Sequence, residues 1–332
     1  MKSTALLLMT VASVALAAPA GGYHVVKRFH IGGEGGWDYL YADSDARRLY
    51  VSHGMQVEVL DLDSGTVVGT IADTPGVHGI AIAPELGRGF ISAGRANKVK
   101  IFDLNTLHTT GEVSTGRNPD AIIYDPATKR VFAFNGGSDS ATVIDAAKGT
   151  VAGTIDLGGK PEFATADGEG HVFVNLEDKS LIVKIDSRKL TAGDRWPLAP
   201  CEEPSGMAID QQHRRLFVGC GNKMMAVVDF GNGKVITTLP IGEGVDANGF
   251  DPETGLAFSS NGEGTLTVVH EESPEKFHVV ENAKTERGAR TMAVDLKTHN
   301  VLLSIAEFGP PQPGSRRPAV LPGTFAILVM GQ

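Results

Sequence analysis

The segment RRLYVSHG, residues 47–54, is the first of seven related stretches that recur along the chain. The other six are GRGFISAG (87–94), KRVFAFNGG (129–137), GHVFVNLE (170–177), RRLFVGCG (214–221), GLAFSSNG (255–262) and HNVLLSIAE (299–307). Their central apolar residues follow one another at intervals of 40 to 44 residues, and they are Tyr50, Phe90, Phe132, Phe173, Phe217, Phe258 and Leu302. Alternating segments rich in Val, Ile, Phe and Gly are typical of strands, not helices. A repeat of this length holds four short strands, which predicts a β-propeller.

The two ends of the chain indicate how the ring closes. The seventh repeat ends with its third strand, at residues 325–330, and no segment remains for a fourth. Residues 23–31 resemble the fourth-strand segment at 150–155, and both lead into two glycines, at 32–33 directly and at 158–159 after two further residues. We therefore predict an all-β, seven-bladed propeller with four-stranded antiparallel blades, closed by the N-terminal strand in the last blade. This pairing would leave no blade edge open at the junction.

Composition and the N-terminal segment narrow the class of protein. The chain has 41 glycines, 21% charged residues and a net charge of −9, which disfavours nucleic-acid binding. Residues 1–17 combine Lys2 with an apolar run and a small-residue cleavage site, as in a secretory signal peptide. This run is too short to be expected to span a bilayer. We expect a signal peptide at 1–17, one propeller domain at 18–332, no membrane insertion, a monomeric state and a periplasmic or secreted location.

The chain has two cysteines, Cys201 and Cys220. Both fall in the fifth repeat, one in the loop before its first strand and the other at the end of its second strand. These two loops emerge on the same face of a propeller, and an exported protein can form disulfides. A disulfide is the preferred interpretation, and metal binding by this pair, which has no nearby histidine spacing, is the alternative.

The repeats resemble a known family. Runs such as Arg-Leu-Tyr-Val-Ser (48–52), Val-Ile-Asp-Ala-Ala-Lys-Gly-Thr-Val (143–151) and Gly-Arg-Asn-Pro-Asp (116–120) are similar to the bacterial extracytoplasmic YVTN-type propellers, which include the YncE-like proteins. The resemblance covers nearly all of the chain after residue 17 and implies a seven-bladed fold outside the cytoplasm. The resemblance implies no catalytic residue, because the repeat motif is structural and a shared fold does not determine which reaction a protein catalyses.

Polar residues recur at one position of the first strand of each repeat, five positions before the end of that strand. They are Asp38, His78, Asp120, Glu162, Ser205, Asp246 and Arg290. Trp37 and His53 are expected on the same face. One interpretation is a solvated channel mouth whose polar groups satisfy the backbone. The other is a ligand pocket in the central funnel, where carboxylates outnumber cations and a metal ion or cationic group would bind. His53 and His78, together with Asp38 or Asp120, are the candidate ligands for a divalent ion.

The last repeat carries an insertion at residues 308–323, which contains five prolines. It is expected to emerge on the funnel face. It is either a surface loop or a lid that presents Arg316 and Arg317 to an anionic ligand or partner.

Three classes of function follow from these features. A binding or scaffolding propeller is favoured, because the sequence has a recognition surface for a small ligand, an ion or a partner protein and no assembled catalytic motif. The main alternative is a metal-assisted lyase or hydrolase at the funnel mouth. A third class, a partner subunit of a redox enzyme, would require a large apolar patch on one face.

Overall fold

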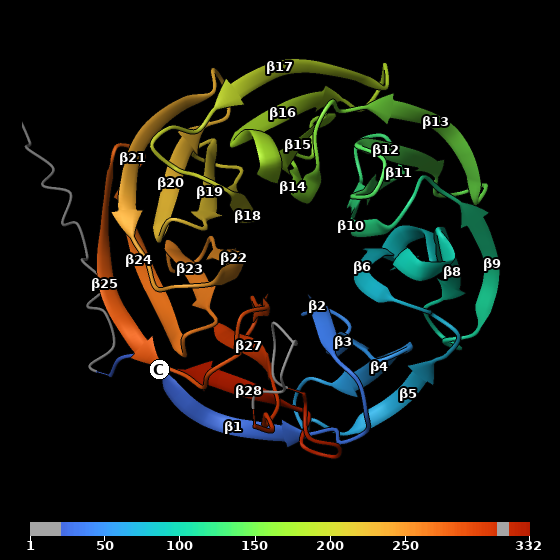
Figure 1. Ribbon diagram of the computed structural model, residues 1–332, viewed down its shortest axis with the longest axis horizontal. Helices are drawn as coiled ribbons and strands as arrows, with labels where there is room; N and C mark the ends of the chain where they lie inside the picture. The colour runs from blue at the N-terminus through green and yellow to red at the C-terminus, as the bar shows by residue number, and fades with distance from the viewer. Residues whose placement is uncertain (1–20, 311–318) are drawn as a thin grey trace, which may run out of the picture.

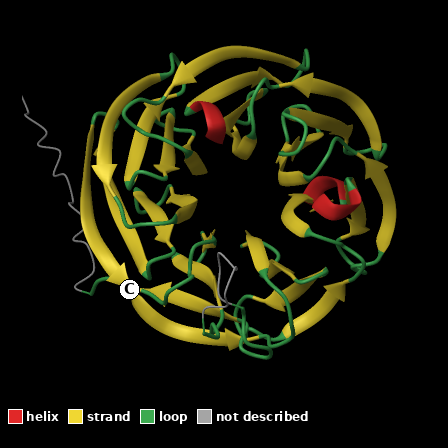
Figure 2. Ribbon diagram, in the orientation of Figure 1, coloured by secondary structure: helices red, strands yellow, loops and turns green. Residues whose placement is uncertain are grey.

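The computed structural model describes residues 21–310 and 319–332. Seven sheets of four antiparallel strands surround a central axis (Figure 1). This arrangement confirms the predicted seven-bladed propeller. Among the described residues the only helices are three short 3-10 turns, Pro84–Leu86, Gly94–Ala96 and Glu177–Lys179 (Figure 2). The expected signal peptide at 1–17 lies outside the described residues.

The strands of each blade run from the axis to the rim in chain order, except in the last blade. The inner strands are β2 (Trp37–Asp43), β6 (Val77–Ala83), β10 (Pro119–Asp125), β14 (Pro161–Ala166), β18 (Pro204–Asp210), β22 (Val245–Asp251) and β26 (Met292–Asp295). The second strands are β3 (Arg48–His53), β7 (Arg88–Ala93), β11 (Arg130–Asn135), β15 (His171–Leu176), β19 (Arg215–Cys220), β23 (Leu256–Asn261) and β27 (Asn300–Ile305). The third strands are β4 (Gln56–Asp61), β8 (Lys98–Asp103), β12 (Ser140–Asp145), β16 (Leu181–Asp186), β20 (Met224–Asp229), β24 (Thr265–Ser273) and β28 (Ala326–Gly331). The outer strands are β5 (Val67–Ile71), β9 (Thr109–Ser114), β13 (Thr150–Asp156), β17 (Thr191–Pro197), β21 (Lys234–Pro240), β25 (Lys276–Lys284) and β1 (His24–His30).

The core lies between neighbouring blades. The seven central residues of the repeated segment are at most 1% exposed, and six of them are aromatic. Burial of an aromatic side chain of this size stabilises the fold by about 2 to 3 kcal/mol, so these positions carry much of the packing between blades. Because the same position recurs in every repeat, the same interface is built seven times around the ring.

The N-terminal strand completes the last blade, as predicted. β1 pairs antiparallel with β28, from His24 opposite Gly331 to His30 opposite Ala326. In Figure 1 this places the first described strand beside the end of the chain. Phe29 is the one buried side chain of β1, and it belongs to the same apolar cluster as Ile327.

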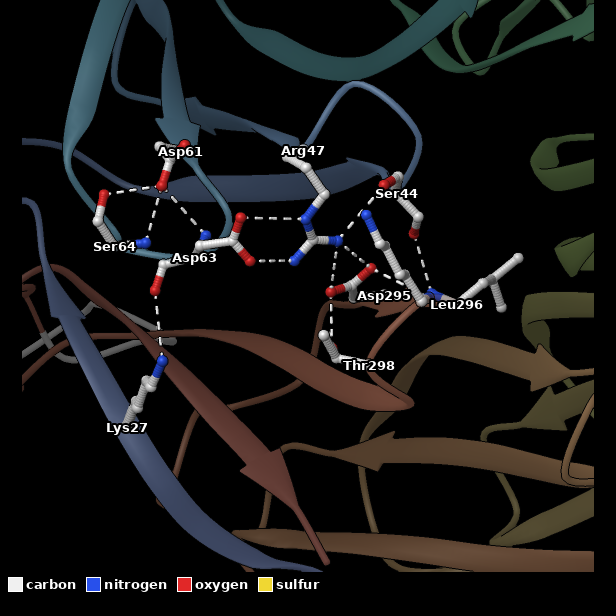
Figure 3. A network of polar contacts seen from close by, with 10 residues as sticks. Lys27, Ser44, Arg47, Asp61, Asp63, Ser64, Asp295, Leu296 and Thr298 are labelled. Carbon is white, nitrogen blue, oxygen red and sulfur yellow. Dashed lines mark hydrogen bonds and ion pairs between the residues drawn. The ribbon is translucent and has the colours of Figure 1, made fainter.

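An ion-pair network reinforces the same junction on the side opposite the funnel (Figure 3). Arg47, in the turn between β2 and β3, donates from Nη1 to Asp295 of the last blade and from Nη2 to Asp63 of the first. The Nη1 to Oδ1 distance to Asp295 is 2.8 Å, and the Asp295 side chain is 3% exposed. Lys27 of β1 donates to the main-chain oxygen of Asp63 in the same network.

Cys201 and Cys220 form a disulfide with a Cα–Cα distance of 5.7 Å, as predicted. Both residues are buried in the core of the fifth blade. Among the residues that the structure describes, no helix has the length and apolar character needed to cross a membrane.

Candidate functional site

The predicted polar ring occupies an irregular part of the inner strands. In β2, Trp37 pairs with His53 and Leu40 with Val51, so one extra residue is accommodated between these two pairs. The pairing of β6, β10, β14, β18 and β22 with their second strands shifts at the same place. Bulges of this kind redirect side chains. The ring residues in these bulges are Asp38, His78, Asp120, Glu162, Ser205 and Asp246, and Arg290 precedes β26.

Side chains of the second strands hold several bulges in place. In these repeats the residue two positions after the central apolar residue is polar. Its side chain donates a hydrogen bond to the main-chain carbonyl of the ring residue in the next blade. Ser92 Oγ donates to Asp120 at 2.5 Å, and Asn175 Nδ2 donates to Ser205 at 2.7 Å. Ser260 bonds Arg290 in the same way. Sequence reasoning missed this role, although the recurrence of a polar residue two positions after the central residue was visible.

Three ring residues from the first three blades meet at one point. His78 Nδ1 lies 2.5 Å from Asp38 Oδ2 and 3.5 Å from Asp120 Oδ1. One potential ligand atom from each of the three residues lies within 4.8 Å of the other two. The three side chains are 17 to 24% exposed, so the cluster is largely shielded from solvent but still accessible. One imidazole and two carboxylates form a set of ligands suited to a first-row divalent ion.

The charge state of this cluster departs from that of free side chains. Burial raises the pKa of Asp120 to about 7, and the charges of Asp38 and Glu162 add to this increase while His78 opposes it. Burial lowers the pKa of His78, but the hydrogen bond to Asp38 and the charge of Asp120 outweigh it and leave that pKa raised. Two carboxylates this close repel one another, and a bound cation would relieve that repulsion.

The other charged ring residues are already paired. Lys160 Nζ lies 3.1 Å from Glu162 Oε2 and also contacts Glu177. Burial raises the pKa of Glu162, and Lys160 opposes that increase. Arg290 forms an ion pair with Asp246. Ser205 Oγ is 3.5 Å from Asp246 Oδ1.

A cavity of about 390 Å³ opens beside the cluster. Its lining has six acidic and two basic side chains, which gives a formal charge of −6 + 2 = −4. The acidic residues are Asp38, Asp120, Glu162, Glu177, Glu203 and Asp246, and the basic residues are Lys160 and Arg290. Glu177 was not among the residues singled out from the sequence. A site of this charge favours cations over anions.

Tyr39 joins this acidic cavity to a second, mainly apolar cavity of about 520 Å³ along the channel. Its ring packs edge-on against Phe163, with 5.2 Å between the ring centroids. Burial and the charge of Asp120 raise the pKa of Tyr39 well above its usual value, which keeps the phenol neutral. The channel is therefore acidic at the funnel end and apolar further along.

His53 and Trp37 lie outside the three-residue cluster. The His53 ring is 3% exposed and stacks on Phe325 with 4.1 Å between centroids, and burial lowers its pKa. Trp37 stacks on the same phenylalanine at 5.4 Å. Across the described ranges, no metal-ligand group within 4.8 Å contains His53, so the structure does not assemble the predicted His53–His78 pair.

Arg316 and Arg317 fall within 311–318, outside the described residues. The ends of the insertion are described, and there Gly309 N–H donates to the carbonyl of Ala319 at 2.8 Å. Phe308 forms an isolated bridge with Val320. The centroid of the Phe308 ring is 6.0 Å from that of Trp37, which places the described ends of the insertion next to the funnel face.

Comparison with known proteins supports the fold alone. No family model matches the chain, and no curated protein matches it. A structure titled Kuenenia stuttgartiensis hydrazine synthase superposes with a TM-score of 0.71 at 14% identity, over 81% of this chain and 92% of that one. The structure of U3-55K superposes with a TM-score of 0.75 at 10% identity, over 93% and 98% of the two chains. At these identities the shared property is the propeller architecture.

Proposed function

We propose that this protein is an extracytoplasmic binding propeller whose central funnel holds a divalent cation through Asp38, His78 and Asp120. The observation that carries the proposal is the meeting of these three residues, from three consecutive blades, within 4.8 Å. Their mixture of nitrogen and oxygen atoms suits Zn²⁺, Mn²⁺ or Co²⁺ better than a hard ion that prefers oxygen alone.

The surroundings of the cluster support a cation. The adjoining cavity has a formal charge of −4, and its cationic side chains are engaged with Glu162, Glu177 and Asp246. The ion would retain coordination positions that face this cavity. A further small ligand or a group of a partner protein could occupy them from the funnel face.

The proposed location and family have separate support. The Cys201–Cys220 disulfide favours an oxidising compartment. Residues 1–17 have the pattern of a signal peptide, and the repeats resemble the YVTN-type propellers. We include the periplasmic or secreted location and membership of the YncE-like group in the proposal.

A metal-assisted hydrolase or lyase is the second candidate, and one feature favours it. Glu162 lines the same cavity as Asp38 and Asp120, and burial raises its pKa. An ion with an open position lowers the pKa of bound water, and a carboxyl group beside that water can act as a general base or acid. In that case Glu162→Gln would abolish turnover but preserve metal binding.

The test is calorimetric titration of metal-stripped protein with ZnCl₂, and in parallel with MnCl₂ and CaCl₂. His78→Ala and Asp120→Asn should each remove one equivalent of bound Zn²⁺ or weaken its binding at least tenfold. His108→Ala is the matched control, because His108 is exposed and lies in a turn of the same blade as His78. Unchanged Zn²⁺ stoichiometry and affinity in His78→Ala would overturn the proposal.

A further inference from the structure

One position of the repeat faces the neighbouring blade and is buried or half-buried in every blade where it can be compared. It follows the third-strand motif, and its N–H donates to a carbonyl in the turn between the first and second strands of its own blade. In blades one to six this residue is Leu62, Leu104, Ala146, Ser187, Phe230 and Glu271. Four of the six are apolar and one is a serine. Glu271 is therefore a carboxylate in a position that the fold otherwise fills with apolar or small side chains.

The serine at this position donates a hydrogen bond that an ionised Glu271 cannot donate. Ser187 Oγ donates to Asp125 Oδ2 of the preceding blade at 2.5 Å. The equivalent acidic residue opposite Glu271 is Asp210, at the end of β18. An ionised glutamate has no proton to donate, so two buried carboxylates face one another where the serine and aspartate form a hydrogen bond.

His213, in the turn after β18, completes a group of three. Its Nδ1 lies 2.7 Å from Asp210 Oδ2 and 3.1 Å from Glu271 Oε1. Neither contact has hydrogen-bond geometry, and within the described residues the side-chain oxygens of Glu271 accept no hydrogen bond. The side chains of Asp210 and Glu271 are 3% and 2% exposed. A buried carboxylate without a partner destabilises the fold unless a cation or a proton compensates it.

Other charged groups nearby do not fill this role. Arg215 lowers the pKa of Glu271, but its guanidinium bonds the carbonyl of Pro274 and forms an ion pair with Glu275 at 3.1 Å. Burial and the charge of Asp210 together raise the pKa of Glu271 to about 7. A proton on Glu271 or a bound cation would compensate the negative charge of this pair.

We propose that Asp210, His213 and Glu271 form a second divalent-cation site, which joins blades five and six. Their potential ligand atoms lie within 4.8 Å of one another. One imidazole and two carboxylates suit a first-row transition ion such as Zn²⁺. The His213 side chain is 38% exposed, so an ion can enter from solvent and keep water ligands.

This site is distinct from the funnel site. Ser205 of β18 lies in the funnel, whereas Asp210 is five residues further along the same strand. Five residues of strand span about 17 Å, which places the two sites at opposite ends of the inner strands. The ion would hold blades five and six together. At the same position, other neighbouring blades are joined by apolar contacts or by the hydrogen bond of a serine.

The experiment uses the His78→Ala protein, stripped of metal, so that the funnel site does not contribute. Titration with ZnCl₂ should show one bound equivalent and a concentration-dependent rise in melting temperature. Adding Glu271→Gln or His213→Ala should each remove that equivalent and that rise. Glu271→Gln is close in shape to the parent and can donate a hydrogen bond to Asp210, so it is expected to fold.

His171→Ala is the matched control. His171 Nδ1 is 2.7 Å from Asp167 Oδ2 in the fourth blade, and the described residues place no further carboxylate in a ligand group with this pair. This variant should bind Zn²⁺ as its parent does. No bound Zn²⁺ in the His78→Ala protein, together with a higher melting temperature for Glu271→Gln than for its parent in the absence of metal, would overturn the proposal. That result would indicate instead that Glu271 is protonated and donates to Asp210. If the funnel proposal alone fails, His78→Ala and the unmodified protein will bind the same number of ions, while the effect of Glu271→Gln remains.

Discussion

Arg47 Nη1 donates to both carboxylate oxygens of Asp295, at 2.8 and 2.9 Å, and joins the first blade to the last across 248 residues of sequence. Asp295 ends β26, the innermost strand of the seventh sheet, whereas β1 is the outermost strand of that sheet. Ring closure therefore depends on main-chain pairing at the rim and on a buried charge pair nearer the axis.

Asp295→Ala should destabilise the protein by about 3 kcal/mol, because it removes the buried partner of the Arg47 guanidinium. Urea denaturation followed by fluorescence measures this change. Asp63→Ala is the control, since Asp63 binds the same guanidinium but its side chain is 66% exposed, and we expect little change there. Equal losses in the two variants would contradict the importance of the buried pair.

The same aspartate should contribute to the acid sensitivity of the fold. Burial alone would raise the pKa of Asp295, but hydrogen bonds from Arg47 and Thr298 outweigh it and hold that pKa below its usual value. A carboxylate with a lowered folded-state pKa stabilises the protein above the pKa of the unfolded chain, and this contribution is lost as pH falls through the folded-state pKa. Asp295→Asn should therefore lose less stability than the parent between about pH 4 and pH 2. Parallel pH curves for the two proteins would refute this assignment.

A chain that begins after Ile31 should aggregate or unfold at a markedly lower temperature. Such a chain lacks β1 and exposes the edge of β28. Phe29→Ala is a milder test of the same contact and should cost about 3 kcal/mol, because Phe29 is buried in the junction. Val25→Ala on the same strand is the control, since Val25 is 46% exposed. A truncated protein that melts with the full chain would exclude a role for β1 in closure.

Reduction of the Cys201–Cys220 disulfide should lower the stability by about 3 kcal/mol in the chain-entropy model without unfolding the ring. Thiol titration of the denatured protein should find no free thiol before reduction and two afterwards. The Cys201→Ala/Cys220→Ala protein should show a similar loss and no response to reductant. Two titratable thiols in the unreduced protein would contradict the bond.

Lys160→Met should strengthen Zn²⁺ binding in the funnel several-fold at pH 8. Lys160 contributes one of the two positive charges that line the acidic cavity, so its loss changes the formal charge from −4 to −5. The gain should shrink as salt concentration rises, because added ions screen the interaction. Lys148→Met is the control, since Lys148 pairs with Asp145 in an outer turn. Weaker binding in Lys160→Met, measured by calorimetry, would count against an electrostatic role for the cavity.

The sequence alone determined the architecture, because the fold depends on a pattern that is local and repeated. The spacing of Tyr50, Phe90 and their equivalents gave seven units, and the missing last strand placed residues 23–31 in the seventh blade. The positions of Cys201 and Cys220 in one repeat likewise predicted their bond. The repeat period remains recognisable after many individual substitutions, because every repeat encodes the same structural unit.

Only the tertiary structure decided which polar residues meet. The sequence placed His53 and His78 on one face, yet His53 stacks on Phe325 of the last blade, while His78 lies between Asp38 and Asp120. The sequence likewise gave no sign that Glu271 faces Asp210 and His213. Such contacts join side chains from different blades, and they depend on bulges, side-chain conformations and burial that no repeat period encodes. Periodicity thus determined where each strand lies, whereas packing between blades determined which charges are buried together.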